Sequence, residues 1–389
     1  MKIAYVYNNM HRPGGIESIT TTKINYLADI DGDEVHLILA SDGKEPPFNP
    51  LSDKVKIHYL DIPYQKTNSL RKAPQWYFNN KRAKKLHEQK MTDLLLKEKF
   101  DIVICVFFNP AVNFLYKIKD GSKKIVETHQ DKYGSVQEAD NSKYPFITGF
   151  FHRRHVKFCD EIAKKYDAFT VLTHSDKVDW ECQNNIHVIY NTTEFVEKYR
   201  DVQANLESKI VLNVGRVTHN RHKGHEDLIQ AWQKVAEKHP DWRLVMMGRK
   251  PPKTDNLDPL IEQLGLQNSI TIEDACEDIS VFYRQASIFA FSSRYEGFGI
   301  ALVEAKSFGL PVVSTNCHHG PSEIVKEGED GYLVPVRDTN ALAEKIIHLI
   351  ENEGLRREMG AKAKENVKMF STENVMTQWK NLFKELINQ

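Results

Sequence analysis

The sequence has few cysteines for its length, and no two of them form a CxxC pair. The 389-residue chain contains five, all far apart: Cys105, Cys159, Cys182, Cys276 and Cys317. A disulfide framework or a structural zinc site needs paired or closely spaced cysteines, so this distribution favours neither. It is typical of a protein kept in a reducing compartment, and we expect a cytoplasmic location.

Long apolar runs are also absent. No window reaches the roughly 18 uninterrupted apolar residues that a membrane-spanning helix requires. The chain starts with "MKIAYVYNNM", a strand-like run without the apolar core of a signal peptide. We therefore expect a soluble protein whose closest relation to a membrane would be peripheral contact with the inner face of the plasma membrane.

The chain has no net charge, because 53 basic residues match 53 acidic ones. No bulk positive field attracts nucleic acid, and we predict no nucleic-acid partner. Basic and aromatic residues do gather locally in residues 66–90, where eight Lys or Arg accompany a single acid, and in "FFHRRHVKF" at residues 150–158. Each segment is either a solvated helix face or a contact with anionic lipid headgroups.

Several motifs of catalysis are missing. The sequence has no Walker A motif, no GxGxxG after its first strand-like run, and no cluster of histidines or carboxylates at metal-ligand spacing. Hydrolysis of nucleoside triphosphates, hydride transfer and metal catalysis are therefore disfavoured. We predict that the protein uses no metal ion and no cofactor.

The pattern that is present predicts an α/β protein with two domains. Short β-branched runs alternate with longer helix-period segments along the whole chain, as in parallel sheets with crossover helices. Residues 191–206 show neither pattern, and a fresh strand-like run, "KIVLNVGRV", follows them. We place a linker there, which predicts doubly wound domains over residues 1–195 and 206–370 and a final helix over residues 371–389.

The stretch "SSRYEGFGIALVEAKSFGLPVVST" combines two carboxylates, two glycines and a helix start. It predicts Glu296 on a loop after a strand and Glu304 about one turn into the following helix. Gly297 and Gly299 allow a ligand to approach the backbone, and the free N–H groups near Ile300 suit an anion such as a diphosphate. A carboxylate does not bind phosphate, so each glutamate would accept hydrogen bonds from sugar hydroxyls. The alternative is a tight turn with two exposed acids.

The same residues carry a family resemblance. Glu-x7-Glu within "EGFGIALVEA", followed by "GLPVVST" and "GPSEIVKEGEDGYLV", resembles the retaining GT-B glycosyltransferases of family 4 over most of residues 208–350. The resemblance implies two Rossmann-like doubly wound domains facing a cleft, with the acceptor bound mainly by the first and the donor mainly by the second. It also implies that the final helix, residues 371–389, returns to the first domain. It also implies that the first glutamate contacts the transferred sugar, the following amides hold sugar and phosphates, and the second glutamate binds ribose. The matching positions are Glu296, Phe298, Gly299, Ile300 and Glu304.

A basic loop, "NVGRVTHNRHKGHEDL", precedes this stretch. Arg216 and Lys223 on this loop could neutralise a diphosphate as it leaves, with Arg supplying a fork of donors and Lys a point charge. The pair looks like the "GR…KG" clamp of the family. His219, Arg221 and His222 lie on the same loop, so the assignment stays open, and a solvated basic loop is the alternative.

The first half offers two weaker signals. Gly14 and Gly15 lie between the first strand and the first helix, where the family uses backbone amides to approach the donor phosphates, although a GG pair is most often only a turn. His129 follows a strand, where a family histidine often faces the transferred sugar. Here "THQD" departs from the commoner "EHN"-like text, and a lone histidine is more often structural.

The resemblance implies a hexosyltransferase of polysaccharide biosynthesis. It would move a hexosyl or acetamidohexosyl group from a nucleotide diphosphate sugar, with a UDP-sugar favoured, to a hydroxyl of an oligosaccharide or lipid-linked saccharide. Transfer would retain the anomeric configuration without a metal. Another GT-B enzyme, such as a nucleotide-sugar epimerase or a sugar phosphorylase, and a non-catalytic nucleotide-sugar-binding protein are the alternatives. An epimerase would convert the donor without an acceptor, and a binding protein would never split it.

Overall fold

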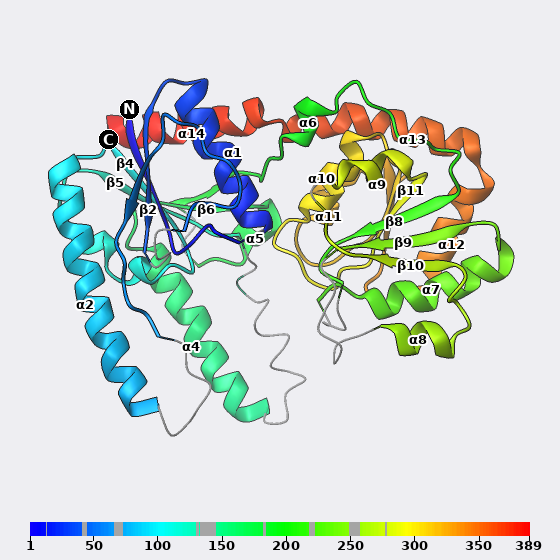
Figure 1. Ribbon diagram of the computed structural model, residues 1–389, viewed down its shortest axis with the longest axis horizontal. Helices are drawn as coiled ribbons and strands as arrows, with labels where there is room; N and C mark the ends of the chain where they lie inside the picture. Colours follow the sequence, from blue (N-terminus) through cyan, green and yellow to red (C-terminus); the bar gives the residue numbers. More distant parts are fainter. Residues whose placement is uncertain are drawn as a thin grey trace. The chain divides into compact units, whose positions relative to one another are not determined.

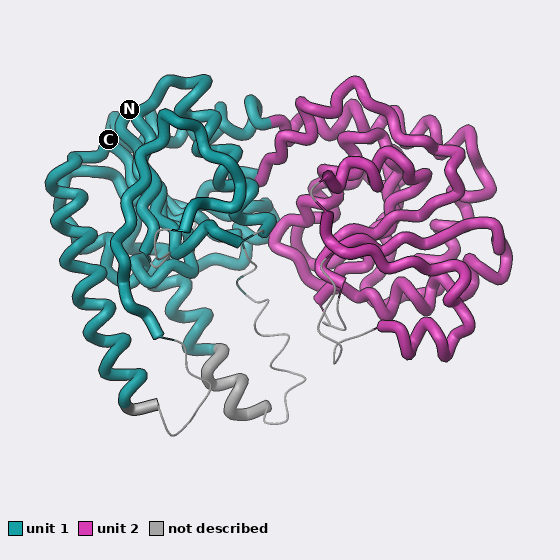
Figure 2. Tube along the Cα trace, viewed as in Figure 1, with its two compact units in different colours: residues 1–190, 372–389 teal, residues 191–371 magenta. Residues whose placement is uncertain are grey.

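The computed structural model describes most of the chain: residues 1–12, 14–40, 45–65, 73–129, 132, 145–181, 184–217, 222–248, 257–276 and 278–389. It divides into two compact units (Figure 2). Unit 1 consists of Met1–Tyr190 and Thr372–Gln389, and unit 2 of Asn191–Ser371. Residues 191–206, which the sequence indicates as a linker, belong to unit 2 and contain a short helix, α6 (Phe195–Lys198).

Unit 1 is built on a parallel sheet of seven strands within the described residues, in the order β3-β2-β1-β4-β5-β6-β7. The strands are β1 (Lys2–Tyr7), β2 (Glu34–Leu39), β3 (Lys56–Tyr59), β4 (Ile102–Val106), β5 (Lys123–Glu127), β6 (Ala168–Val171) and β7 (Ile186–Val188). The order runs outward in both directions from β1 and β4, so the chain changes direction between these two strands. Ligands of doubly wound sheets bind at the carboxyl ends of the strands at this switch point.

Unit 2 repeats the arrangement in a second parallel sheet, ordered β10-β9-β8-β11-β12-β13 in the described part of the chain. Its strands are β8 (Ile210–Val214), β9 (Arg243–Met247), β10 (Ile270–Glu273), β11 (Ile288–Phe291), β12 (Val312–Thr315) and β13 (Gly331–Val334). The switch point lies between β8 and β11, which pair directly. The sequence-based expectation of two doubly wound parallel sheets is therefore confirmed.

Helices cover both faces of the first sheet (Figure 1). They are α1 (Gly15–Asp29), α2 (Ala73–Glu98), α4 (Pro145–Ala163), α5 (His174–Val178), α14 (Thr372–Asn388) and the short helices η2 (Pro110–Asn113) and η3 (Leu115–Lys117). One core forms against α2 and α4, with Met91 and Ile162 among its residues. The other forms against α1 and α14, where Ile24, Trp379 and Phe383 are buried. The final helix of the chain thus completes unit 1.

The helices of unit 2 follow the same logic. They are α6, α7 (His225–Lys238), α8 (Asp258–Gln263), α9 (Ser280–Gln285), α10 (Ile300–Ser307), α11 (Pro321–Ile324), α12 (Thr339–Glu351), α13 (Glu353–Asn366) and η5 (Val367–Phe370). In α7, Leu228, Trp232 and Val235 recur at helical spacing and form one buried stripe against the sheet. Among the described residues, no helix has both the length and the apolar character needed to cross a membrane.

Candidate active site

The predicted strand, loop and helix around the two glutamates are present at the switch point of unit 2. β11 ends at Phe291, Glu296 lies on the loop that follows, and Glu304 lies in α10. Gly299 adopts φ 97° as the residue before the helix, a left-handed conformation that residues with a Cβ rarely take. The sharp entry into α10 that this glycine provides is what holds Glu296 at the carboxyl edge of the sheet.

Glu296 and Lys223 form the centre of the site. Lys223 Nζ donates to Glu296 Oε1 at 2.6 Å, and Ser293 Oγ donates to the same oxygen at 2.6 Å. The carboxylate is only 12% exposed and the ammonium 31%. Two residues that the sequence assigns to different parts of a donor, its sugar and its diphosphate, therefore lie in direct contact.

The loops after β8 and β11 are fastened to each other through the backbone. Gly224 has φ 58°, and a Cβ at this position would lie 2.1 Å from the carbonyl oxygen of Ser292. Ser292 Oγ in turn donates to the Lys223 carbonyl at 2.9 Å. No side chain fits between the two loops at this point. Their close contact therefore fixes the position of Lys223 relative to Glu296.

A largely buried ion pair also holds the loop after β11. The Arg294 guanidinium donates two hydrogen bonds to Asp227 of α7, at 2.7 and 2.5 Å, and both side chains are only 10% exposed. The hydrogen bonds to Asp227 raise the pKa of Arg294, so it remains a cation. A bidentate pair of this kind sets the orientation of the loop that carries Glu296.

Arg216 stands apart from this network. It follows Gly215 at the end of β8, is exposed, and makes no ion pair or hydrogen bond with the described residues. The backbone beneath it is tightly packed, because a Cβ on Gly248 (φ 154°) would lie 1.7 Å from the Gly215 carbonyl oxygen. Among the described residues, Arg216 is therefore a cation without a partner, next to a tightly packed backbone. His219 and Arg221 lie outside the described residues.

The segment after β12 supports the loop from below. Gly320 has φ 95°, and a Cβ there would lie 1.8 Å from the carbonyl oxygen of Phe298, which is itself 2% exposed and packs edge-on against Phe370. Lys306 of α10 is fully buried and donates to Asp330 at 2.7 Å. The segment "GPSEIVKEGEDGYLV" thus has a structural role. It packs against the loop and the start of α10 and so holds Gly297, Phe298, Gly299 and Ile300 in position.

Glu304 has a different environment from Glu296. Its Oε2 accepts a 2.8 Å hydrogen bond from the hydroxyl of Tyr283, a fully buried side chain on α9 that stacks on Phe308. Burial raises the pKa of Glu304 to about 7, against the opposing effect of the Tyr283 hydrogen bond. Among the described residues, the second oxygen, Oε1, accepts no hydrogen bond, and the carboxyl group changes its charge near neutral pH.

The predicted residues of unit 1 lie at the carboxyl edge of its own sheet. Gly14, extended at φ −171°, precedes α1, which begins at Gly15. His129 follows β5 and is 2% exposed; its Nε2 lies 2.5 Å from Glu127 Oε1. The structure therefore gives His129 an anionic neighbour two residues away, a partner that the sequence reading did not consider.

Sequence reasoning missed several residues of these networks, among them Asp227, Tyr283, Ser293 and Arg294. Their contacts join positions 67 apart in the chain for Arg294 with Asp227 and 21 apart for Tyr283 with Glu304. No local pattern signals such pairs. Ser293 is the exception, because it lies three residues from Glu296, and a contact over this short distance can be expected in a turn.

The two doubly wound units, with charged residues at the switch point, define the GT-B fold, and solved structures share it. A sucrose-phosphate synthase from Thermosynechococcus elongatus matches with a TM-score of 0.80 at 19% identity, covering 100% of this chain and 99% of that chain. A variant of TarM from S. aureus, solved with UDP, fondaparinux and α-GlcNAc-glycerol, matches with a TM-score of 0.75 at 16% identity over 98% and 100% of the two chains.

The sequence comparisons match unit 2 to a known family. Residues 195–366 match the family described as glycosyl transferases group 1. An uncharacterized glycosyltransferase of Haemophilus influenzae is 28% identical over 98% of this chain and 99% of that protein. The amylovoran biosynthesis glycosyltransferase AmsD of Erwinia amylovora is 30% identical over 58% of this chain and 63% of its own.

Proposed function

We propose that this protein is a retaining glycosyltransferase of family 4 that acts in polysaccharide biosynthesis. It transfers a hexosyl or acetamidohexosyl group from a nucleotide diphosphate sugar, with UDP as the favoured nucleotide, to a hydroxyl of an oligosaccharide or lipid-linked saccharide. The observation that carries the proposal is the contact of Lys223 with Glu296 at the switch point of unit 2, which matches the group 1 glycosyl transferases. The similarity to AmsD supports a role in polysaccharide biosynthesis. The similarity to TarM, solved with UDP, supports UDP as the nucleotide.

The site supplies what such a transfer needs. The bond between the sugar C1 and the diphosphate oxygen breaks, a bond from C1 to the acceptor oxygen forms on the same face, and the acceptor proton passes to the departing diphosphate. Arg216 and Lys223 offset the negative charge that grows on the diphosphate. Glu296 accepts hydrogen bonds from the sugar hydroxyls and stabilises the positive charge that develops at C1. Gly14, Gly15 and His129 of unit 1 would serve the donor phosphates and the transferred sugar.

The reaction would need neither a metal ion nor a cofactor, because two cations and the N-terminus of α10 can serve the diphosphate. The test is to incubate the protein with UDP-glucose, UDP-galactose and their N-acetylated forms, with alkyl hexosides as acceptors and EDTA in excess. We expect sugar transfer from one of these donors to one of the acceptors. NMR of the product should show that the anomeric configuration of the donor is retained. Activity that needs a divalent ion, an inverted product, or donor conversion without an acceptor would each overturn part of the proposal.

Glu304 should make nucleotide affinity depend on pH. Its pKa of about 7 means that it is largely protonated below this pH, and a neutral carboxyl accepts hydrogen bonds from ribose less strongly than a carboxylate. We expect UDP affinity to rise between pH 6 and about pH 8. Tyr283→Phe removes the hydrogen bond that lowers the pKa, so the midpoint should move to higher pH. Calorimetric titration of UDP across this range measures both effects.

Glu304→Gln is the control for this dependence. It should bind UDP more weakly than the parent by about 1 to 3 kcal/mol, the range for a charged hydrogen bond left unmade. Its affinity should no longer change with pH in this range. A parent protein with pH-independent UDP affinity, or a Glu304→Gln variant with the parent's profile, would remove Glu304 from the nucleotide site.

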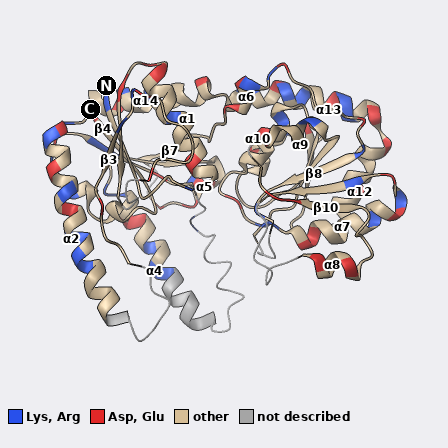
Figure 3. Ribbon diagram, viewed as in Figure 1, with Lys and Arg blue, Asp and Glu red and all other residues tan. Residues whose placement is uncertain are grey.

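A membrane-bound acceptor would require contact between unit 1 and the lipid surface, and we include this contact in the proposal. In Figure 1 the N-terminal part of α2 projects beyond the sheet, and Figure 3 shows Lys and Arg along it. Its aromatic residues are exposed, at 37% for Trp76, 56% for Tyr77 and 61% for Phe78. Of the two segments predicted to contact lipid, residues 66–72 and the side chains of residues 150–152 lie outside the described part of the chain.

Neutralising the basic residues of α2 should release the protein from anionic vesicles. The variant replaces four exposed residues by Gln: Lys81, Arg82, Lys84 and Lys85. Each basic residue near such a surface contributes about 1 kcal/mol, so co-sedimentation with phosphatidylglycerol vesicles should be largely lost while UDP affinity is unchanged. The matched control replaces four exposed basic residues of unit 2: Lys238, Lys326, Arg357 and Lys362. Equal loss in both variants, or no binding by the parent, would contradict the lipid contact.

A further inference from the structure

A cluster of three charged or titratable side chains is buried where β5 meets α1. Lys23 of α1, Glu127 at the end of β5 and His129 just beyond it have side chains that are 2%, 1% and 2% exposed. Lys23 Nζ donates to Glu127 Oε1, the same oxygen that His129 approaches. Burying a charge is costly unless it is paired with an opposite charge. The three side chains therefore have to lie within contact distance of one another.

The contact of Glu127 with His129 is electrostatic. His129 Nε2 lies 2.5 Å from Glu127 Oε1, and neither ring nitrogen has a partner that meets hydrogen-bond criteria in the described part of the chain. Two lone pairs would repel each other at this separation. Nε2 therefore carries a proton, which the carboxylate attracts.

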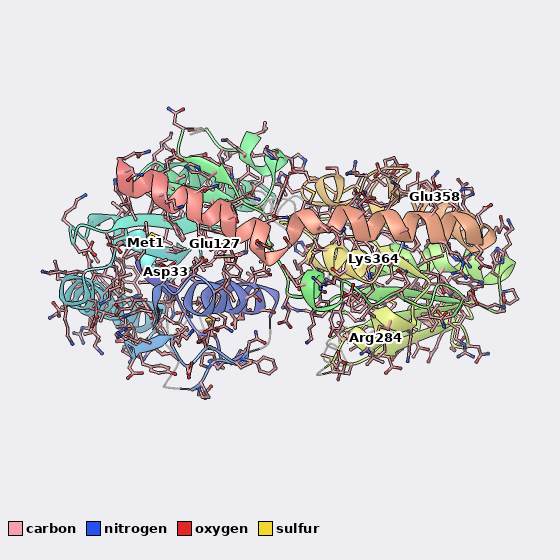
Figure 4. The ribbon with its side chains drawn as sticks, turned by 90° about the horizontal axis from the view of Figure 1, so that it is seen from above. Met1, Asp33, Glu127, Arg284, Glu358 and Lys364 are labelled. Carbon is pink, nitrogen blue, oxygen red and sulfur yellow. The ribbon has the colours of Figure 1, made fainter. Side chains whose placement is uncertain are left out.

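Lys23 keeps Glu127 ionised. Burial alone would raise the pKa of Glu127, but the charges of Lys23 and His129 prevail and lower it to about 2. Burial also lowers the pKa of Lys23, and its contact with Glu127 opposes that change. The ammonium lies 4.8 Å from the centre of the Trp379 ring on α14, so the last helix of the chain covers the ion pair with an aromatic face. Figure 4 labels Glu127 among the elements of unit 1.

We infer that Glu127 is a positioning residue for His129: fixed by Lys23, it holds the imidazole ring in place and keeps the proton on Nε2. The inference rests on the proposed function in one respect, which is the assignment of His129 to the transferred sugar. It adds two residues, Lys23 and Glu127, that never touch the substrate and act through the histidine. A ring in the wrong orientation or tautomer would lower the rate of transfer without changing how the nucleotide binds.

Among the described residues, the other titratable groups at this cluster are on α1 and β1. Burial raises the pKa of Tyr5 of β1, and the charge of Glu127 raises it further. Burial also raises the pKa of Tyr7, followed in effect by Glu17 of α1, which accepts a 3.2 Å hydrogen bond from the Tyr7 hydroxyl. From α14 the contacting group is the uncharged indole of Trp379. Glu127, paired with Lys23, is therefore the anion that lies against His129 in the described part of the chain.

Two variants separate positioning from simple structural support. Glu127→Gln keeps the shape of the side chain but removes the anion, so His129 should lose its proton at a lower pH than in the parent. Lys23→Met removes the competing cation, so His129 should keep its proton to a higher pH. The ring signals of His129, followed by NMR on the full-length protein and assigned with His129→Ala, report both midpoints. Lys23→Gln replaces Lys23→Met if the latter does not fold.

The matched control is Asp160→Asn, which breaks another buried ion pair of unit 1, that of Lys132 with Asp160 at 2.7 Å, with no histidine on the carboxylate oxygens. It should lower stability and leave the His129 titration unchanged. In kinetics, Glu127→Gln should lower kcat by up to about hundredfold with donor KM nearly constant, and Glu127→Asp should recover part of the loss. Shifts of the two midpoints in the same direction, or no shift in either variant, would overturn the inference.

The result also distinguishes this inference from the proposed function. If His129→Ala transfers sugar at the parent's rate while the two midpoints still shift in opposite directions, Glu127 positions His129 but the histidine has no part in transfer. If His129→Ala is inactive and neither midpoint moves, the histidine acts in transfer and the positioning role is wrong.

Discussion

Glu296→Gln is expected to lower the rate of sugar transfer by about 10² to 10³-fold while changing UDP affinity by less than about threefold. The substitution keeps the shape of the side chain and removes the charge that stabilises the developing positive charge at C1. Free UDP has no transferred sugar and so does not use this carboxylate. Steady-state turnover and calorimetric UDP affinity, measured on the same preparation, check both halves of the prediction.

The contact with Lys223 sharpens this test. Because Lys223 Nζ and Glu296 Oε1 are 2.6 Å apart, each side chain holds the other in place. The double variant Glu296→Gln with Lys223→Ala should therefore lose less activity than the product of the two single losses. Lys238 and Glu351, also 2.6 Å apart, provide the matched control at the far end of α7, and Glu351→Gln should transfer sugar normally. If Glu296→Gln weakens UDP binding while Glu304→Gln does not, the roles of the two glutamates are reversed.

Arg216→Ala should weaken UDP binding and slow transfer, with a loss of about 10² to 10³-fold in turnover. Arg216 is exposed and has no partner in the described part of the chain, so its charge is available to the diphosphate at no cost in broken contacts. Its effect should be largest on turnover, because charge on the leaving group grows as the sugar bond breaks. Transfer rates and UDP affinity of the variant, with circular dichroism to confirm the fold, measure this outcome.

The control for Arg216 is Arg243→Ala. Arg243 is also exposed, but it begins β9 and so lies at the amino edge of the same sheet, away from the site. The Arg243→Ala variant should bind UDP and transfer sugar as the parent does. If the Arg216→Ala variant also binds UDP and transfers sugar like the parent, the loop after β8 is a solvated basic loop and not a diphosphate clamp.

The ion pair of Lys223 with Glu296 has a consequence for how a donor would enter. Lys223 donates one hydrogen bond to Glu296, and its ammonium has further N–H donors for an arriving diphosphate. Sugar hydroxyls of the donor can add hydrogen bonds to Glu296. Intact donor would therefore use both side chains, whereas free UDP would use only the lysine. Donor should bind more tightly than UDP in the parent, and this preference should be lost in Glu296→Gln.

Much of the fold could be predicted from the sequence, because the signals are local. Runs such as "KIAYVY" and "KIVLNV" are too apolar and β-branched to be surface loops, and they became β1 and β8. Gly309, which follows α10, has φ 70°, the left-handed conformation in which glycine commonly ends a helix. The loop position of Glu296 and the helical position of Glu304 followed from the same kind of evidence.

The tertiary structure alone decided which charges meet. Lys23 and Glu127 are 104 positions apart, and Lys223 and Glu296 are 73 apart. Lys223 meets Glu296 because the order of strands brings distant loops to one edge of a sheet, and Lys23 meets Glu127 because α1 packs against the sheet that contains β5. Strand order depends on packing of whole helices against both faces, which no local pattern encodes. The sequence by itself therefore determined the elements and the residue types at their ends. The partners of Glu296, Glu304 and His129 depended on the assembled sheets.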